Sequence, residues 1–141
     1  KEIIDLDPDF FGGHLWLGEV YMLQLGQYED AIIEYKLAAS LEKGPHSLSS
    51  LGVCYAYLKE YDNTREIIEE LKKIEGIEHS GNYYIGWVYE ALGEWDSAFE
   101  YFYKAIENRE GMALWIKLNV SPEFLEDPRF KELEEKMNIV Y

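Results

Sequence analysis

The sequence predicts an all-α solenoid built from three antiparallel helix pairs, and three observations support this prediction. One phrase recurs at a fixed step of 34 residues, as Leu17-Gly18-x-x-Tyr21, Leu51-Gly52-x-x-Tyr55 and Ile85-Gly86-x-x-Tyr89. A second pattern follows each copy, as Ala31-x3-Tyr35, Thr64-x3-Ile68 and Ala98-x3-Phe102. Periods of this size are typical of stacked helix pairs. The chain has 141 residues and is 48% hydrophobic, which is enough for one continuous core.

Turn residues place the six repeat helices in order, at 9–25, 28–42, 45–59, 62–74, 80–92 and 95–108. Gly26 and Gly93 follow the first helices of pairs one and three. Gly44-Pro45 ends the first pair and begins the second, because Pro is tolerated in the first turn of a helix. The first pair has one extra residue before Gly26, which predicts a bulge or a looser turn. The second pair has Lys59 at the turn position where the others have Gly.

Small residues at two positions of each pair predict close helix crossings. Gly18, Gly52 and Gly86 fall on the first helices, and Ala31, Thr64 and Ala98 fall on the second helices. A glycine within a helix costs about 1 kcal/mol relative to alanine, so we expect the close approach of the paired helix to offset that cost.

The two ends of the chain depart from the repeat. Residues 1–8 are predicted to be the end of a preceding repeat helix, so we expect the chain to be part of a longer protein. Met112 to Leu118 is predicted to form one or two helical turns that resemble the first helix of a pair. Two helix starts follow, each with a capping residue before a proline: Ser121-Pro122 and Asp127-Pro128. The second start is predicted to begin a helix that runs through Met137. Four apolar side chains would cover the open end of the last repeat: Phe124, Phe130, Leu133 and Met137. The predicted divisions are 1–8, 9–44 (repeat 1), 45–78 (repeat 2), 79–111 (repeat 3) and 112–141 (cap), all in one domain.

The recurring phrase resembles the tetratricopeptide repeat, whose pattern is a large residue, Leu-Gly, Tyr, Ala, an aromatic residue and then Pro. The resemblance covers roughly residues 1–109 and implies a right-handed solenoid that binds proteins along a concave groove lined by the first helices. The sequence Asp127-Pro128-Arg129-Phe130 resembles the capping tail of bacterial and archaeal regions of this family that are attached to cyclases, kinases or winged-helix regulators.

Aligning the three repeats position by position predicts a peptide-binding groove whose side chains are aromatic and acidic. We expect at least three of its five aromatic side chains to be accessible to solvent; packing between repeats is the alternative. Glu19 and Glu90 would favour a Lys or Arg on the partner. The predicted groove residues are Leu15, Trp16, Glu19, Leu23, Ser50, Val53, Tyr57, Tyr83, Tyr84, Trp87 and Glu90.

Charge narrows the class of partner. The formal net charge is −15 and the sequence pI is about 4.5. Such a surface repels phosphate backbones and anionic lipids, so we expect a protein or peptide partner of apolar or basic character, and neither nucleic acid nor membrane. The resemblance also excludes an acidic chaperone tail, because the positions that hold its carboxylate carry no positive charge here: Leu15, Glu19, Ser50, Ser80 and Tyr84.

Catalytic, cofactor and metal sites are not expected. His14, His46 and His79 fall near helix starts in successive repeats, without a second ligand at metal-binding spacing, and phosphate-binding and nucleophile motifs are missing. Cys54 is the only cysteine and falls on an apolar position of its repeat, so we interpret it as a buried hydrophobe. The single cysteine and the lack of a signal peptide favour a cytoplasmic location.

Two functional hypotheses remain. The first is a non-catalytic interaction module whose groove accepts a protein or peptide segment. The second is a regulatory or assembly region of a larger enzyme or transcription regulator, which includes self-association. An autonomous enzyme is a third reading that no group of residues supports.

Overall fold

The computed structural model describes residues 10–141, and the predicted remnant of a preceding repeat at 1–8 lies outside them. The described chain is helical, which confirms the predicted all-α solenoid class. Its elements are α2 (Phe11–Glu19), η1 (Val20–Gln24), α3 (Tyr28–Leu41), α4 (Pro45–Tyr57), α5 (Tyr61–Lys72), α6 (Ile77–Ser80), α7 (Asn82–Leu92), α8 (Trp95–Glu107), η2 (Gly111–Trp115), α9 (Ile116–Asn119), α10 (Pro122–Glu126) and α11 (Pro128–Val140).

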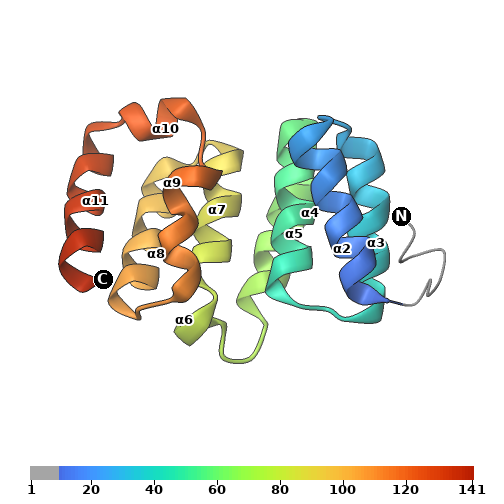
Figure 1. The fold of residues 1–141 in the computed structure, drawn as a ribbon, viewed down its shortest axis with the longest axis horizontal. Helices are drawn as coiled ribbons and strands as arrows, with labels where there is room; N and C mark the ends of the chain where they lie inside the picture. The colour runs from blue at the N-terminus through green and yellow to red at the C-terminus, as the bar shows by residue number, and fades with distance from the viewer. Residues whose placement is uncertain (1–9) are drawn as a thin grey trace.

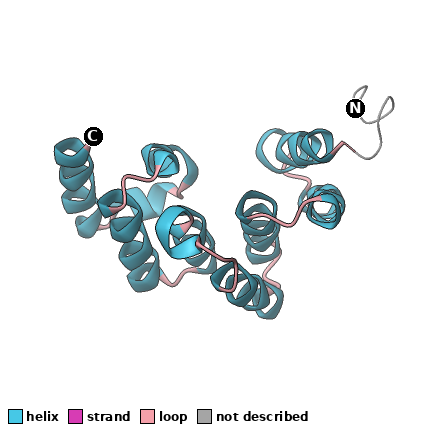
Figure 2. Cartoon of the chain, turned by 90° about the horizontal axis from the view of Figure 1, so that it is seen from below, coloured by secondary structure: helices cyan, strands magenta, loops and turns pink. Residues whose placement is uncertain are grey.

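The helices pack as successive pairs. Helix α2 contacts α3, α4 contacts α5, and α7 contacts α8, while α4 also contacts α3 and α7 and so joins the pairs to one another (Figure 1). Seen from below, the helices follow a curved path from one terminus to the other, as Figure 2 shows. The first helices of the pairs, α2 with η1, α4 and α7, line the hollows described below and so lie toward the inside of the curve. The core runs continuously from Met22 to Leu133.

The three repeat glycines lie at close helix crossings, as the sequence predicts. A Cβ atom on Gly18 would lie 2.7 Å from the Tyr35 ring, and one on Gly86 would lie 2.7 Å from the Phe102 ring. On Gly52 it would lie 2.9 Å from Cγ2 of Ile67. Real Cβ atoms essentially never approach this closely, so each crossing depends on the missing side chain.

The extra residue of the first pair is absorbed by a π-helical turn. Element η1 is a π-helix, and the N–H of Leu25 donates to the carbonyl oxygen of Val20, five residues earlier. An i→i+5 turn holds one more residue than an α-helical turn. The predicted bulge is therefore present, and Gly26 still reaches the turn with a φ of 63°. Lys59 occupies the same turn in the second pair with a φ of 61°, although it has a side chain.

The first helix of the third pair, α7, starts at Asn82, two residues after the predicted start, and ends at the predicted residue. A separate short helix, α6, precedes it and ends at Ser80. A carboxylate from beyond α8 supports the start of α7: Glu110 accepts hydrogen bonds from the backbone N–H groups of Asn82 and Tyr83, both at 3.0 Å. It thereby pairs two of the N–H groups that every helix start leaves free.

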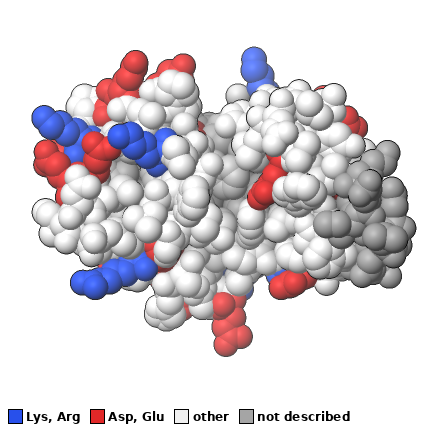
Figure 3. All heavy atoms as spheres, viewed as in Figure 1, with Lys and Arg blue, Asp and Glu red and all other residues white. Residues whose placement is uncertain are grey.

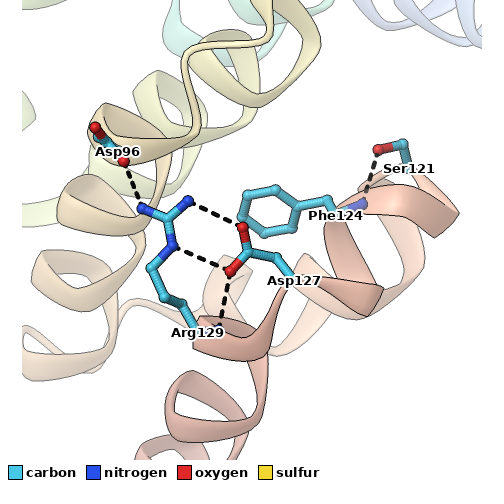
Figure 4. A network of polar contacts seen from close by, with 5 residues as sticks. All are labelled: Asp96, Ser121, Phe124, Asp127 and Arg129. Atoms are coloured by element: carbon cyan, nitrogen blue, oxygen red, sulfur yellow. Dashed lines mark hydrogen bonds and ion pairs between the residues drawn. The ribbon is translucent and has the colours of Figure 1, made fainter.

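The C-terminal helices pack against α8, the second helix of the last repeat. The Phe124 ring stacks on Phe99 of α8 with centroids 4.4 Å apart, and Phe124 and Leu133 are fully buried. Ser121 and Asp127 cap their helices by accepting backbone N–H groups. Arg129 extends this network, because its guanidinium bonds both Asp127 and Asp96 of α8, as Figure 4 shows. The cap is fixed to α8 by both apolar and charged contacts.

Candidate protein-binding groove

Residues 111–121, here called the crossing segment, lie on the concave side of α7 (Figure 1). Ala113, Ile116 and Val120 of this segment are buried. The indole N–H of Trp87 donates to the carbonyl oxygen of Asn119 at 3.1 Å, and the Asn119 side chain donates to the Tyr83 hydroxyl at 2.7 Å. The chain's own C-terminal region therefore occupies the concave face of its last repeat.

Glu90 is not available to a cation of a partner, which corrects the sequence prediction. Both the backbone N–H and the hydroxyl of Ser121 donate to its Oε1, at 3.0 and 2.6 Å. The side chain is only 4% exposed. Burial raises the pKa of the Glu90 carboxyl, while the two bonds from Ser121 oppose that rise. Glu90 anchors the crossing segment instead of facing solvent.

A hollow of about 480 Å³, here called the central hollow, remains between the crossing segment and the first repeat. This is within the range of about 300–1,000 Å³ that ligand pockets span. Figure 3 views the face that holds it, where few side chains are charged and most of those lie toward the edges. The hollow is lined by Glu19, Met22, Leu23, His46, Ser50, Tyr83, Tyr84, Trp87, Met112, Trp115 and Asn119.

A second hollow of about 400 Å³ continues from the first. The two share Met22, Leu23, Trp87 and Asn119 in their linings, so they form one groove. The second hollow adds Val53, Tyr28, Tyr57 and residues 118, 120, 121 and 122 of the C-terminal region. The Tyr28 and Tyr57 rings lie 5.0 Å apart at its edge. The groove thus has one wall from the first repeat and one from the crossing segment.

The predicted groove residues divide into three groups. Eight line the two hollows, although burial of Val53, Tyr83 and Trp87 leaves little of their surface accessible: Glu19, Leu23, Ser50, Val53, Tyr57, Tyr83, Tyr84 and Trp87. Leu15 and Trp16 lie outside both hollows, and Trp16 is 57% exposed. Glu90 is bound to Ser121. Among the aromatic residues, Trp16 and Tyr57 are exposed, Tyr84 is half-buried, and the other two are buried.

Sequence reasoning missed the wall formed by the crossing segment. Met112, Trp115 and Asn119 all line the central hollow, and Trp115 is 52% exposed. A signal was present, because the stretch from Met112 to Leu118 has the character of another first helix. Such a helix would follow α7 on the concave side of the stack, as η2 and α9 do.

Polar groups in the central hollow are few and differ in their pairing. At one side, Nε2 of His46 lies 2.9 Å from Oε1 of Glu19. Below the lining, the buried hydroxyl groups of Ser50 and Tyr35 lie beside each other, and their interaction opposes the rise that burial causes in the pKa of Tyr35.

In the described residues, the single thiol is buried and no group of side chains is placed to hold a metal ion. Cys54 is fully buried, and burial raises the pKa of its thiol to about 12, so the nucleophilic thiolate is not formed near neutral pH. Within residues 10–141, no group of three or more His, Cys, Asp or Glu side chains is placed to hold a metal ion. In the same range, every helix is too short or too polar to cross a membrane.

These features define a helical-repeat protein with a groove on its concave side. Two segments, residues 13–44 and 82–109, match family models described as the tetratricopeptide repeat. The matches support the tetratricopeptide-repeat family, whose repeats are generally protein-interaction modules and generally non-catalytic. Searches of curated proteins and of solved structures found no significant match.

Proposed function

We propose that this chain is a non-catalytic interaction module that binds a protein or peptide segment of apolar and basic character in the groove between α2–η1 and the crossing segment. One observation carries the proposal: the two hollows join into a groove whose walls expose large apolar side chains. Leu23 is 66% exposed on one wall, and Trp115 and Leu118 are 52% and 72% exposed on the other. Apolar residues gathered in this way are typical of docking sites.

The groove differs from the one that the repeat register predicts. Its acidic residue is Glu19 alone, because Glu90 is bound to the crossing segment. Its aromatic character comes from Tyr57, Tyr84 and Trp115, which retain accessible surface. A short segment with one basic residue and apolar neighbours fits this arrangement better than a long extended peptide, because the crossing segment already covers α7.

A peptide-display selection tests the proposal. Peptides selected on the wild-type protein should bind 10-fold or more weakly to Leu23→Asp and Glu19→Lys variants, measured by fluorescence anisotropy, because one loses apolar contact and the other reverses the charge. Ile33→Asp on α3 is the matched control, since Ile33 is 57% exposed and lies outside both hollows. Equal binding to all four proteins would place the site elsewhere and reject the groove.

A second candidate is association of this region with another copy or another domain. An apolar row on α3 favours it, because Ile33, Leu37 and Leu41 follow one another at four-residue steps and are 57%, 43% and 43% exposed. The resemblance of the tail to regions attached to cyclases, kinases or regulators motivates the same idea. Sedimentation equilibrium of the wild type and a Leu37→Lys variant tests it: a monomeric wild type at all concentrations would argue against self-association.

A further inference from the structure

The central hollow is a composite of repeats and cap, and its lining is mainly aromatic. Tyr84 and Trp87 come from α7, and Trp115 comes from the crossing segment on the opposite side. The ring of His46 lies 6.0 Å from that of Tyr84. Aromatic faces carry negative electrostatic potential, so rings that converge on one space favour a cation there.

A single carboxylate sets the charge of the central hollow. Among residues 10–141, Glu19 is the one acidic residue of the lining; its side chain is 33% exposed, and its Oε1 lies 2.9 Å from Nε2 of His46. No Lys or Arg of the described residues lines the hollow. In a chain with a net charge of −15, the long-range field also draws cations toward this surface.

A hydroxyl of the lining has room for one more hydrogen bond. Ser50 lines the hollow, is 1% exposed, and its hydroxyl lies beside that of Tyr35. A hydroxyl oxygen can accept a hydrogen bond while donating its own proton, so Ser50 can interact with Tyr35 and still accept from another group. A donor group entering the hollow would give the Ser50 oxygen a second partner.

We propose that the central hollow binds an arginine side chain of a protein partner, with the guanidinium between Trp115 and Tyr84, paired with Glu19 and donating to Ser50. This inference rests on the proposed function and names the residue that the groove selects. Arginine fits better than lysine because its planar guanidinium stacks on aromatic rings, is weakly hydrated, and has enough donors to bond a carboxylate and a hydroxyl together.

The crossing segment is then part of the binding site and not only a cover for the last repeat. Trp115 reaches the hollow from a segment that Asn119 and Ser121 tether to α7. The repeats without this segment would present Glu19 and Tyr84 but would lack the opposite ring. The arginine site therefore needs both the repeats and the cap.

Nuclear magnetic resonance titration tests the inference with two probes of the same shape, acetyl-Leu-Arg-Leu-amide and its citrulline analogue, which has no charge. We expect the arginine probe to shift the Trp115 indole N–H and the Ser50 amide in a saturable way, and to bind about tenfold more tightly than the citrulline probe. Glu19→Gln and Trp115→Leu should each weaken arginine binding several-fold. Glu29→Gln and Trp16→Leu are matched controls, because both residues are exposed and lie outside the hollow.

The outcomes separate this inference from the proposed function. Equal binding of the citrulline probe, or tighter binding of a lysine analogue, would overturn the arginine site. Failure of all probes, with display-selected peptides still sensitive to Leu23→Asp, would overturn the arginine site and leave the groove intact. Failure of the selected peptides as well would reject the groove itself. Circular dichroism of each variant confirms that the compared proteins are folded.

Discussion

Substitution of Gly52 tests the packing on which the helix pairs depend. A Cβ atom at this position would lie 2.9 Å from Cγ2 of Ile67 on α5 and 3.1 Å from Cγ1 of Val88 on α7. Both neighbours are branched side chains in a buried core, with 6% and 0% exposure, so neither can swing into solvent. A side chain at Gly52 therefore pushes two helices away at once.

The expected change in the free energy of unfolding follows from two opposed effects. Replacing a helical Gly by Ala gains about 1 kcal/mol of helix propensity, whereas overpacking a core costs about 1–3 kcal/mol. Gly52→Ala should therefore destabilise by roughly 0–2 kcal/mol. Gly52→Val places two further methyl groups in the same space and loses part of the propensity gain, so we expect a cost of about 2–3 kcal/mol.

Urea unfolding followed by circular dichroism measures these changes, with the slope of the transition checked for constancy. Thermal unfolding should show a midpoint lower by about 4–12 °C for Gly52→Val. Gly111→Ala is the control, since a Cβ atom at Gly111 meets no heavy atom within 4 Å, and it should change stability by less than about 1 kcal/mol.

A double-variant cycle isolates the contact itself. Ile67→Ala removes the methyl group nearest to Gly52, so in that background Gly52→Ala should become stabilising, by up to about 1 kcal/mol. A cost for Gly52→Val within about 0.5 kcal/mol of that for Gly111→Ala would refute the close-crossing argument, as would an unchanged effect of Gly52→Ala in the Ile67→Ala background.

Three further predictions concern charged groups and one turn. Lys59→Gly should raise the free energy of unfolding by up to about 1 kcal/mol, because Lys59 has a φ of 61° and side chains disfavour that conformation; a lower midpoint would contradict this. Glu110→Ala should cost about 1–3 kcal/mol in the same assay, since the first N–H groups of α7 lose their acceptor, and an unchanged midpoint would count against the cap. Burial raises the pKa of the Glu90 carboxyl in the folded state. The contribution of Glu90 to stability is therefore greatest when the pH is below its pKa in the unfolded state, and it is lost as pH rises through its higher pKa in the folded state. The stability of Glu90→Gln relative to wild type should therefore increase from about pH 4 to pH 7, because Gln keeps an acceptor for Ser121 without a charge; a constant difference would exclude ionisation of Glu90 as the cause.

Local patterns were sufficient to predict much of the fold. The spacing of Gly18, Gly52 and Gly86 predicted the helix crossings, because only a missing side chain permits the observed approach to the paired helix. The one-residue excess before Gly26 predicted an irregular turn, since a helix can hold an added residue only by widening. Ser121 and Asp127 predicted helix starts, because a cap needs only a side-chain oxygen two or three residues before the N–H that it accepts.

Long-range contacts decided the features that the sequence did not predict. Glu110 reaches the start of α7 from 28 residues away, and Ser121 binds Glu90 from 31 residues away. The repeat register placed Glu90 on the correct helix face, but a register cannot show what covers that face. The same limitation hid the contribution of Trp115, because the repeat phrase contains no residue equivalent to it.

The crossing segment explains why the groove lies off the centre of the solenoid. In an array of identical helix pairs, α7 would offer its concave face to a partner as α4 does. Here Asn119 and Ser121 already bond that face, and a partner that displaced them would expose Ile116 and leave Glu90 buried without its donors. Because an unpaired buried carboxylate and exposed apolar surface both cost free energy, a partner binds at lower cost beside the segment. The surface that remains is bounded by Leu23 on one side and Trp115 on the other, so the cap that closes the last repeat also determines where the protein can bind.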